Sequence, residues 1–112
     1  MDINRHTDDG EVRLALAGEL DMSTVDQLNG HVEQVFTHFP PPRRLVVDLA
    51  EVTFCDSTGI GALVKALNTA TDHHISFRVT NPNGSVRKVL QVTGLLDIMT
   101  RESAGDPGRS GG

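Results

Sequence analysis

The sequence contains one cysteine, no tryptophan and no tyrosine, and it has no apolar run long enough to span a bilayer. Cys55 alone cannot form an internal disulfide, and it lacks the companion ligands of a thiolate metal site. Four phenylalanines without tryptophan or tyrosine offer no stacking platform for nucleic-acid bases. Residues 1–5 have no hydrophobic region of the signal-peptide kind. These absences favour a cytoplasmic protein that uses no metal or cofactor.

Positive charge is also scarce. The chain has 10 lysines and arginines against 15 aspartates and glutamates, a net charge of −5. A protein that neutralises nucleic-acid phosphates, or that binds an anionic membrane, needs a basic face instead. Other proteins and small molecules therefore remain as partners. The 112 residues suffice for one domain, and the hydrophobic fraction of 38% suits an ordinary globular protein.

The first third of the chain predicts a hairpin followed by a helix. Residues 11–17 alternate between apolar and polar, as in a half-buried strand, and turn residues at 8–10 predict a partner strand at 3–6. A helix follows, capped by Ser23 with Asp26 and ended by three prolines at 40–42. Its apolar face is formed by residues three or four positions apart, namely Val25, Leu28, Val32, Val35, Phe36 and Phe39.

The rest of the chain alternates strands and helices. Residues 45–49 resemble a strand covered on both faces, helical spacing returns at 60–70, and strand alternation returns at 75–79. A third helix, capped by Ser85 and closed by Gly94, carries Val86, Val89, Leu90 and Val92, and a short apolar segment follows at 95–99. The order β-β-α-β-α-β-α predicts an α/β domain with a largely parallel sheet and an antiparallel edge. Residues 103–112, rich in Gly, Ser and Asp, are predicted to be a disordered tail.

Ser57 lies where an apolar segment, 52–54, passes into a helix. The first N–H groups of a helix lack internal partners, and the helix dipole places partial positive charge there. A hydroxyl at this junction can serve as an N-cap, as a nucleophile or as the acceptor of a phosphoryl group. Residues 56–58 are also the types that a helix N-terminus prefers, so they can be simply a cap, with Gly59 and Gly61 allowing close packing of helix on sheet.

Enzyme motifs around Ser57 are incomplete. A nucleophile elbow has glycine at the position of Cys55, and the sequence pairs no particular histidine with Ser57. The extra residue in the Asp-Ser-Thr-Gly run of 56–59 breaks the spacing of an aspartic protease. A glycine-rich phosphate loop ending in Lys-Ser or Lys-Thr is absent as well. The sequence predicts no enzyme, and a small serine hydrolase remains the alternative from that class.

Three segments carry a further pattern. They are Gly18-Glu19-Leu20-Asp21, the run Phe-Cys-Asp-Ser-Thr-Gly-Ile-Gly-Ala-Leu at 54–63, and Val86-Arg87-Lys88-Val89-Leu90 leading to Thr93-Gly94-Leu95. In this order and spacing, over about residues 1–100, the chain resembles the anti-sigma factor antagonists, which are single-domain bacterial proteins of the STAS family. That family's fold has a mixed sheet of four or five strands with three or four helices mainly on one side. It agrees with the predicted order and implies a STAS domain at 1–102.

The resemblance implies a regulatory role for Ser57. In that family the serine directly after the aspartate is phosphorylated by the anti-sigma factor, which is itself a serine kinase. The unphosphorylated antagonist binds the anti-sigma factor and frees a sigma factor, phosphorylation breaks the complex, and a phosphatase restores it. The free protein is expected to be a monomer. Carried across, the partner-binding residues are Glu19, Asp21, Asp56, Ser57, Thr58, Gly59, Ile60 and Gly61.

Phosphorylation adds about two negative charges, which a helix N-terminus accepts with roughly 0.3–1 kcal/mol of favourable interaction. The fold is therefore expected to survive the modification. If Glu19, Asp21 and Asp56 lie near Ser57, the added charge deepens an acidic patch and repels acidic groups of the kinase. The resulting switch acts at the interface, with little internal rearrangement.

Several of these residues also have a purely structural interpretation. Glu19 and Asp21 can be solvated residues of a connection. Ile60 and Leu63 are predicted in the core, although an exposed Ile60 would suit the centre of an interface. Cys55 is predicted to be a small buried hydrophobe, with a redox role as the alternative.

The main rival function within the same fold is a phosphorylation-independent STAS module, such as an accessory subunit of a lipid-transport complex.

Overall fold

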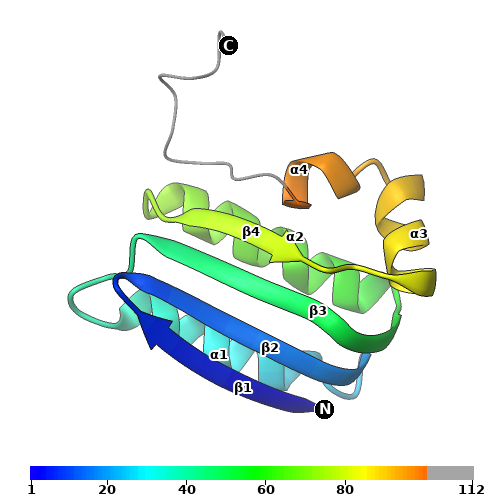
Figure 1. The fold of residues 1–112 in the computed structure, drawn as a ribbon, viewed down its shortest axis with the longest axis horizontal. Coiled ribbons are helices and arrows are strands. Elements are labelled where there is room, and N and C mark those ends of the chain that lie inside the picture. The colour runs from blue at the N-terminus through cyan, green and yellow to red at the C-terminus, as the bar shows by residue number, and fades with distance from the viewer. Residues whose placement is uncertain (101–112) are drawn as a thin grey trace, which may run out of the picture.

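A four-stranded sheet in the order β1-β2-β3-β4 forms the centre of the structure (Figure 1). The computed structural model describes residues 1–100. Strand β1 (Asp2–Asp8) pairs antiparallel with β2 (Glu11–Leu20), whereas β3 (Arg44–Cys55) pairs parallel with both β2 and β4 (Ser76–Thr80). The predicted hairpin and the largely parallel sheet with an antiparallel edge are confirmed.

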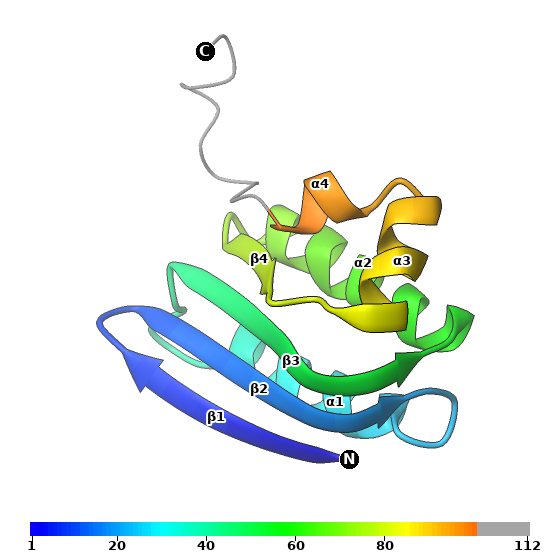
Figure 2. The same ribbon diagram turned by 45° about the vertical axis from the view of Figure 1, so that its right-hand side comes forward.

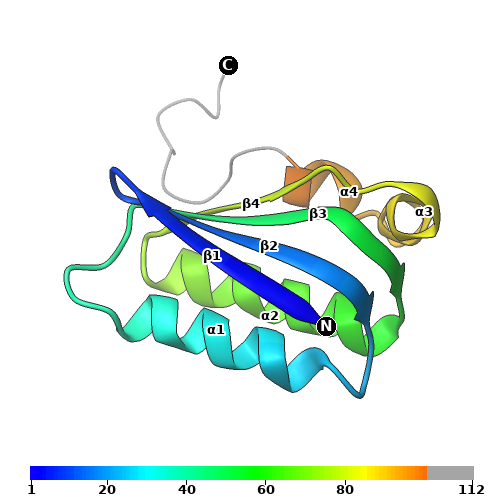
Figure 3. The ribbon, with the colours of Figure 1, turned by 60° about the horizontal axis from the view of Figure 1, so that its bottom comes forward.

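Four helices accompany the sheet within residues 1–100. Helices α1 (Val25–Thr37) and α2 (Ser57–Asp72) cover one face (Figure 3). Helix α3 (Gly84–Val92) packs against β3, and α4 (Leu96–Thr100) packs against β4, the edge strand opposite β1 (Figure 1). The predicted α/β fold class is confirmed. The tail predicted at 103–112 lies outside the described residues, as does the domain boundary at 102.

The main core lies between the sheet and the first two helices. Alternation along β2 directs Val12, Leu14 and Leu16 toward the helices, and each is at most 7% exposed. Parallel pairing sets Leu14 beside Val47, which is also fully buried. The helical residues that close this core are Leu28, Val32, Val35, Leu63, Ala66 and Ala70. Burial of each large aliphatic side chain stabilises the fold by about 1.5–3 kcal/mol.

Two bulges lengthen β3 relative to β2. The register shows that β3 takes up one extra residue within 48–51 and another within 52–54. The predicted strand at 45–49 and the apolar segment at 52–54 are consequently parts of one strand, which bends toward α2 (Figure 3). Across each bulge the next residue that faces the core comes three positions along the strand instead of two. The buried residues in this part of β3 are therefore Leu49, Val52 and Cys55.

Helix α1 differs from its prediction at both ends. It begins after Thr24, and Ser23 hydrogen-bonds the carboxylate of Asp21, so the predicted capping box is wrong. At the other end the helix stops at Thr37, and Phe39 is 89% exposed, not part of the apolar face. The reason is Pro40, because a residue that precedes proline is disfavoured in helical backbone conformation.

Helix α3 also departs from the sequence prediction. It begins at Gly84 after Asn83, which places Ser85 inside its first turn and not at the cap. Val86 and Leu90, four residues apart, are buried, whereas Val92 is 76% exposed. At 100° per residue Val92 lies about 120° around the helix from Val86, outside the buried stripe. The helix ends as predicted, with a glycine of positive φ (78°) at position 94.

Candidate functional site

The junction between β3 and α2 makes Ser57 the first residue of the helix. Asp56 is the N-cap: its backbone is extended, and its Oδ1 accepts a hydrogen bond from the Gly59 N–H at 2.9 Å. The side chains of Ser57 and Thr58 are exposed and take no part in this cap. The interpretation of the segment as a helix cap therefore holds for Asp56, and the Ser57 hydroxyl is accessible to another molecule.

The end of β2 lies directly beside this junction (Figure 2). The Asp56 N–H donates to the Leu20 carbonyl at 3.2 Å, and the register pairs Leu20 with Cys55 and Glu19 with Phe54. Leu20 and Cys55 are buried, so alternation turns Glu19 and Phe54 to the opposite, exposed side of the sheet. Two segments more than 30 residues apart in sequence thus meet at one end of the molecule.

Asp21 organises the connection between β2 and α1. Its Oδ1 accepts hydrogen bonds from the Ser23 hydroxyl at 2.7 Å and from the Ser23 N–H at 2.9 Å. These bonds from Ser23, first its hydroxyl and then its N–H, lower the pKa of the Asp21 carboxyl. Thr24 adds a second tie, because its hydroxyl donates to the Glu19 carbonyl at 2.7 Å and accepts from the Asp21 N–H at 2.9 Å. Asp21 therefore fixes the conformation of this loop. The exposed Glu19 side chain lies at the end of β2, next to the loop.

The two glycines of the junction have different roles. A Cβ added to Gly59 would lie 2.5 Å from the Leu20 carbonyl oxygen and 2.9 Å from Cys55 Sγ. Only glycine therefore lets the first turn of α2 approach the end of β2 this closely. A Cβ added to Gly61 would meet nothing within 4 Å. Close packing as a reason for glycine is confirmed for Gly59 and wrong for Gly61.

The eight residues predicted to contact a partner differ in exposure. The core interpretation of Ile60 is confirmed, since this side chain is 8% exposed, and Leu63 is fully buried. A buried residue can act on a partner only by positioning its neighbours. Glu19, Ser57, Thr58 and Gly61 are exposed, Asp21 and Asp56 are half-buried, and Gly59 and Ile60 are buried.

Two apolar residues at this end were missed by the sequence analysis. Met22, in the connection after β2, is 75% exposed, and Phe54, near the end of β3, is 45% exposed. The signal for Phe54 was the alternation of the strand. Because Cys55 faces the core, its neighbour must face outward.

The Cys55 thiol is buried beneath the junction, 3% exposed. Burial, and secondarily the negative charge of Asp56, raise its pKa to about 11. A thiol with a raised pKa stays protonated and unreactive at neutral pH. The prediction of a small buried hydrophobe is confirmed, and the raised pKa gives no support to the redox alternative.

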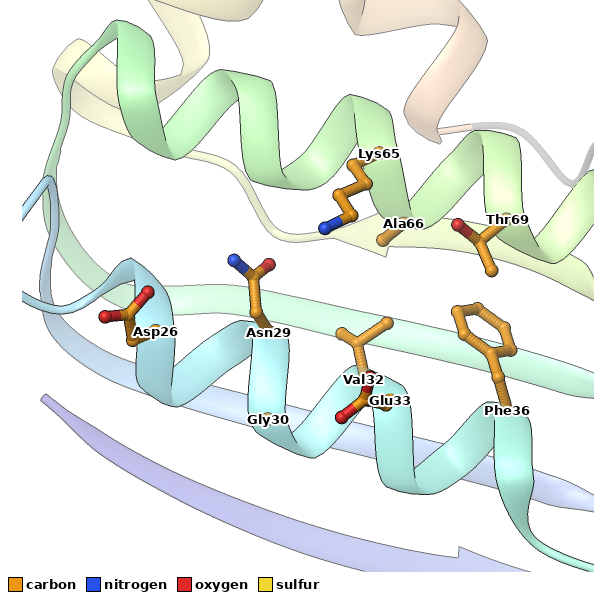
Figure 4. A pocket seen from close by; sticks show the side chains of 9 residues that line it. All are labelled: Asp26, Asn29, Gly30, Val32, Glu33, Phe36, Lys65, Ala66 and Thr69. Atoms are coloured by element: carbon orange, nitrogen blue, oxygen red, sulfur yellow. The ribbon is translucent and has the colours of Figure 1, made fainter.

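A groove of about 400 Å³ runs between α1 and α2 (Figure 4). Lys65 and Asn29 extend toward one another across it, and the Phe36 ring faces Thr69 at one end. None of the predicted site residues lines this groove. Within residues 1–100, no three His, Cys, Asp or Glu side chains gather closely enough to hold a metal ion, and no helix is both long and apolar enough to cross a membrane.

Comparison with known proteins identifies the class of this domain. A family model described as Mlab, STAS domain, matches residues 3–100, so the chain belongs to the STAS domain family. Within this class it is similar to the anti-sigma-B factor antagonist of Staphylococcus aureus, with 29% identity over 101 residues that cover 88% of this chain and 90% of the relative. The resemblance seen in the three sequence segments is thereby confirmed.

Solved structures show the same fold. An anti-sigma factor antagonist from Mycobacterium paratuberculosis superimposes with a TM-score of 0.73 at 24% identity, covering 88% of this chain and 81% of that one. The Bacillus cell fate determinant SpoIIAA in its phosphorylated form gives a TM-score of 0.68 at 20% identity, covering 96% of both chains.

Proposed function

We propose that this protein is a cytoplasmic anti-sigma factor antagonist that binds a serine-kinase anti-sigma factor while Ser57 is unphosphorylated, and so releases a sigma factor. Phosphorylation of Ser57 ends this binding, and a phosphatase restores it. The observation that carries the proposal is an exposed serine at the first position of α2, next to an N-cap that does not use it. Similarity to the anti-sigma-B factor antagonists supports the same role.

The position of Ser57 explains how the fold tolerates a phosphate. The N–H groups in the first turn of a helix lack internal acceptors, and the dipole is positive there. The neighbouring carboxylate of Asp56 opposes the added charge, and water screens both groups in the free protein. These opposing effects are each small at an exposed site, so phosphorylation leaves the domain folded.

The same phosphate acts differently inside a complex. A docked partner excludes water, and the repulsion between the phosphate and the carboxylates of Asp56 and Glu19 grows as the local dielectric constant falls. The phosphate must also lose much of its hydration. Both costs exist only in the complex, so the phosphorylated protein dissociates while its fold stays intact. Gly59 and Ile60 contribute by positioning this surface, and Glu19, Thr58 and Gly61 by touching the partner.

The modification site is tested by incubating the purified chain with purified serine-kinase anti-sigma factors of the same organism and Mg-ATP. Mass spectrometry should place one phosphate on Ser57. Ser57→Ala should abolish it, whereas the matched control Thr58→Ala should retain it. Phosphate on Thr58, or none with any of these kinases, would refute the assignment.

The switch is tested by titrating the same kinase with variants. Ser57→Ala should bind as tightly as the wild type, and Ser57→Glu should bind at least about tenfold more weakly, as expected for a charge placed in an interface. Equal binding by both would instead indicate the phosphorylation-independent STAS module. Labelling of Ser57 by a fluorophosphonate would favour the hydrolase.

A further inference from the structure

Large apolar side chains are exposed at five positions within residues 1–100, which are Met22, Phe39, Phe54, Val92 and Ile98. Two of them, Met22 and Phe54, belong to the two segments that meet at Ser57. Single exposed apolar residues are common on protein surfaces. A pair that flanks a modification site from two elements is a more specific arrangement.

Chain geometry limits how far this pair lies from Ser57. Phe54 is three residues before Ser57, so their Cα atoms are at most about 11 Å apart at about 3.8 Å per residue. Met22 is two residues after Leu20, whose carbonyl accepts the Asp56 N–H at 3.2 Å. Its Cα is therefore within about 8 Å of the Leu20 Cα. The Phe54 Cα thus lies close to Ser57, and Met22 lies just beyond the end of β2 that adjoins the same junction.

Ser57 and the apolar pair belong to the same end of the molecule. A standard specific interface buries about 800 Å² on each partner, which corresponds to a disc of about 16 Å radius. A disc of that size centred on Ser57 extends past the Phe54 Cα and past the end of β2 that leads to Met22. A partner that phosphorylates Ser57 therefore docks at the end of the molecule where Phe54 and Met22 are exposed.

The backbone at both positions is held in place before binding. Phe54 is a strand residue between Cys55, which is buried, and Thr53, whose hydroxyl donates to the Gly18 carbonyl at 3.4 Å. Met22 lies in the loop that the Asp21 and Ser23 hydrogen bonds close. A backbone that is already ordered loses little conformational entropy on association, which favours affinity. The carboxylates of Glu19 and Asp56 supply the polar surround that usually encircles such an anchor.

We propose that Phe54 and Met22 form the apolar anchor by which the serine-kinase anti-sigma factor holds the unphosphorylated protein, in an apolar pocket on the kinase. This inference rests on the proposed function. It also gives a further reason why phosphorylation weakens kinase binding, because in the complex a phosphate on Ser57 would lose its water beside an aromatic ring. Ile60 is buried and so cannot supply the apolar centre of this surface, whereas Phe54 and Met22 are exposed.

The test compares Phe54→Thr with Phe39→Thr in binding to the kinase that phosphorylates the wild type. Threonine keeps strand propensity at position 54, and Phe39 provides a control aromatic that is even more exposed, at 89%, in the connection between α1 and β3. Phe54→Thr should raise Kd at least about tenfold, as for an interface hot spot, and Met22→Gln should raise it several-fold. Phe39→Thr should change it less than about twofold. Thermal melts of all variants check that each is folded.

Phosphorylation kinetics give a second measurement. Because the anchor serves docking and not phosphoryl transfer, Phe54→Thr should raise KM for the protein substrate about tenfold while kcat changes little. Undiminished binding by folded Phe54→Thr, or an equal loss with Phe39→Thr, overturns the inference and leaves the proposed function standing. A wild-type chain that binds no such kinase overturns both. Loss of self-association in Phe54→Thr, with kinase binding unchanged, would show that a second copy covers this surface and would also overturn the inference.

Discussion

At the scale of single residues, packing requires glycine at position 59 but not at position 61. Gly59→Ala should destabilise the protein by about 2 kcal/mol, because the new methyl group meets the Leu20 carbonyl and Cys55 Sγ. Gly61→Ala should stabilise it by about 0.5–1 kcal/mol, since that site is open and alanine favours a helix. Urea denaturation of the two variants measures both effects. Effects of the same sign would contradict this account of the junction.

Residues also show why part of the site was predictable. The Asp56 cap and the place of Ser57 at a helix start follow from local residue types. The proximity of Glu19 came from the family resemblance, since no local pattern joins residues in β2 and α2. The exposure of Phe54 was missed because the strand at 52–54 was not connected to 45–49, and without a register its faces could not be assigned.

At the scale of elements, the end of α2 contains a residue in a strained backbone conformation. His74 follows the helix with a positive φ of 59°, and the Ile75 N–H closes the turn on the Ala70 carbonyl at 2.8 Å. A residue with a Cβ pays about 1 kcal/mol in this region, and glycine does not. His74→Gly should therefore stabilise the protein by about 1 kcal/mol in urea denaturation.

The neighbouring histidine supplies the matched control. His73 has a negative φ of −96°, its ring Nδ1 lies 3.0 Å from the Thr69 carbonyl, and it stacks on Phe36 with centroids 5.4 Å apart. His73→Gly should destabilise the protein, because it loses these contacts and gains no relief of strain. Stabilisation by both substitutions would indicate general loop loosening and not relief at position 74.

Strand β3 was predicted as two separate segments because its extent depends on distant contacts. Periodicity located β2, α2 and β4 because their packing repeats locally. The first bulge of β3 is instead stabilised by Asp48, whose carboxylate accepts the Ala50 N–H at 3.0 Å and the Asn81 side-chain amide at 3.1 Å. Asn81 is 33 residues away in sequence, so no short window could reveal the bulge.

At the scale of the whole molecule, the ion pairs and the proposed switch occupy different regions. Arg43 pairs with Asp9 and Arg44 with Glu11 near the hairpin, where β3 begins. The carboxylates of Glu19 and Asp56 lie where β2 and β3 end. Charge added at Ser57 therefore meets the exposed face of one end and disturbs neither the core nor the ion pairs at the hairpin.

This separation predicts that the switch leaves global stability unchanged. Ser57→Glu should alter the free energy of unfolding by no more than about 0.5 kcal/mol, as is usual for exposed positions. Asp56→Ala should cost about 1 kcal/mol, because it removes the N-cap that binds the Gly59 N–H. Urea denaturation of both variants beside the wild type makes the comparison. If Ser57→Glu instead proved as destabilising as Asp56→Ala, the phosphate would act by loosening the start of α2, and the switch would belong to the fold and not to the interface.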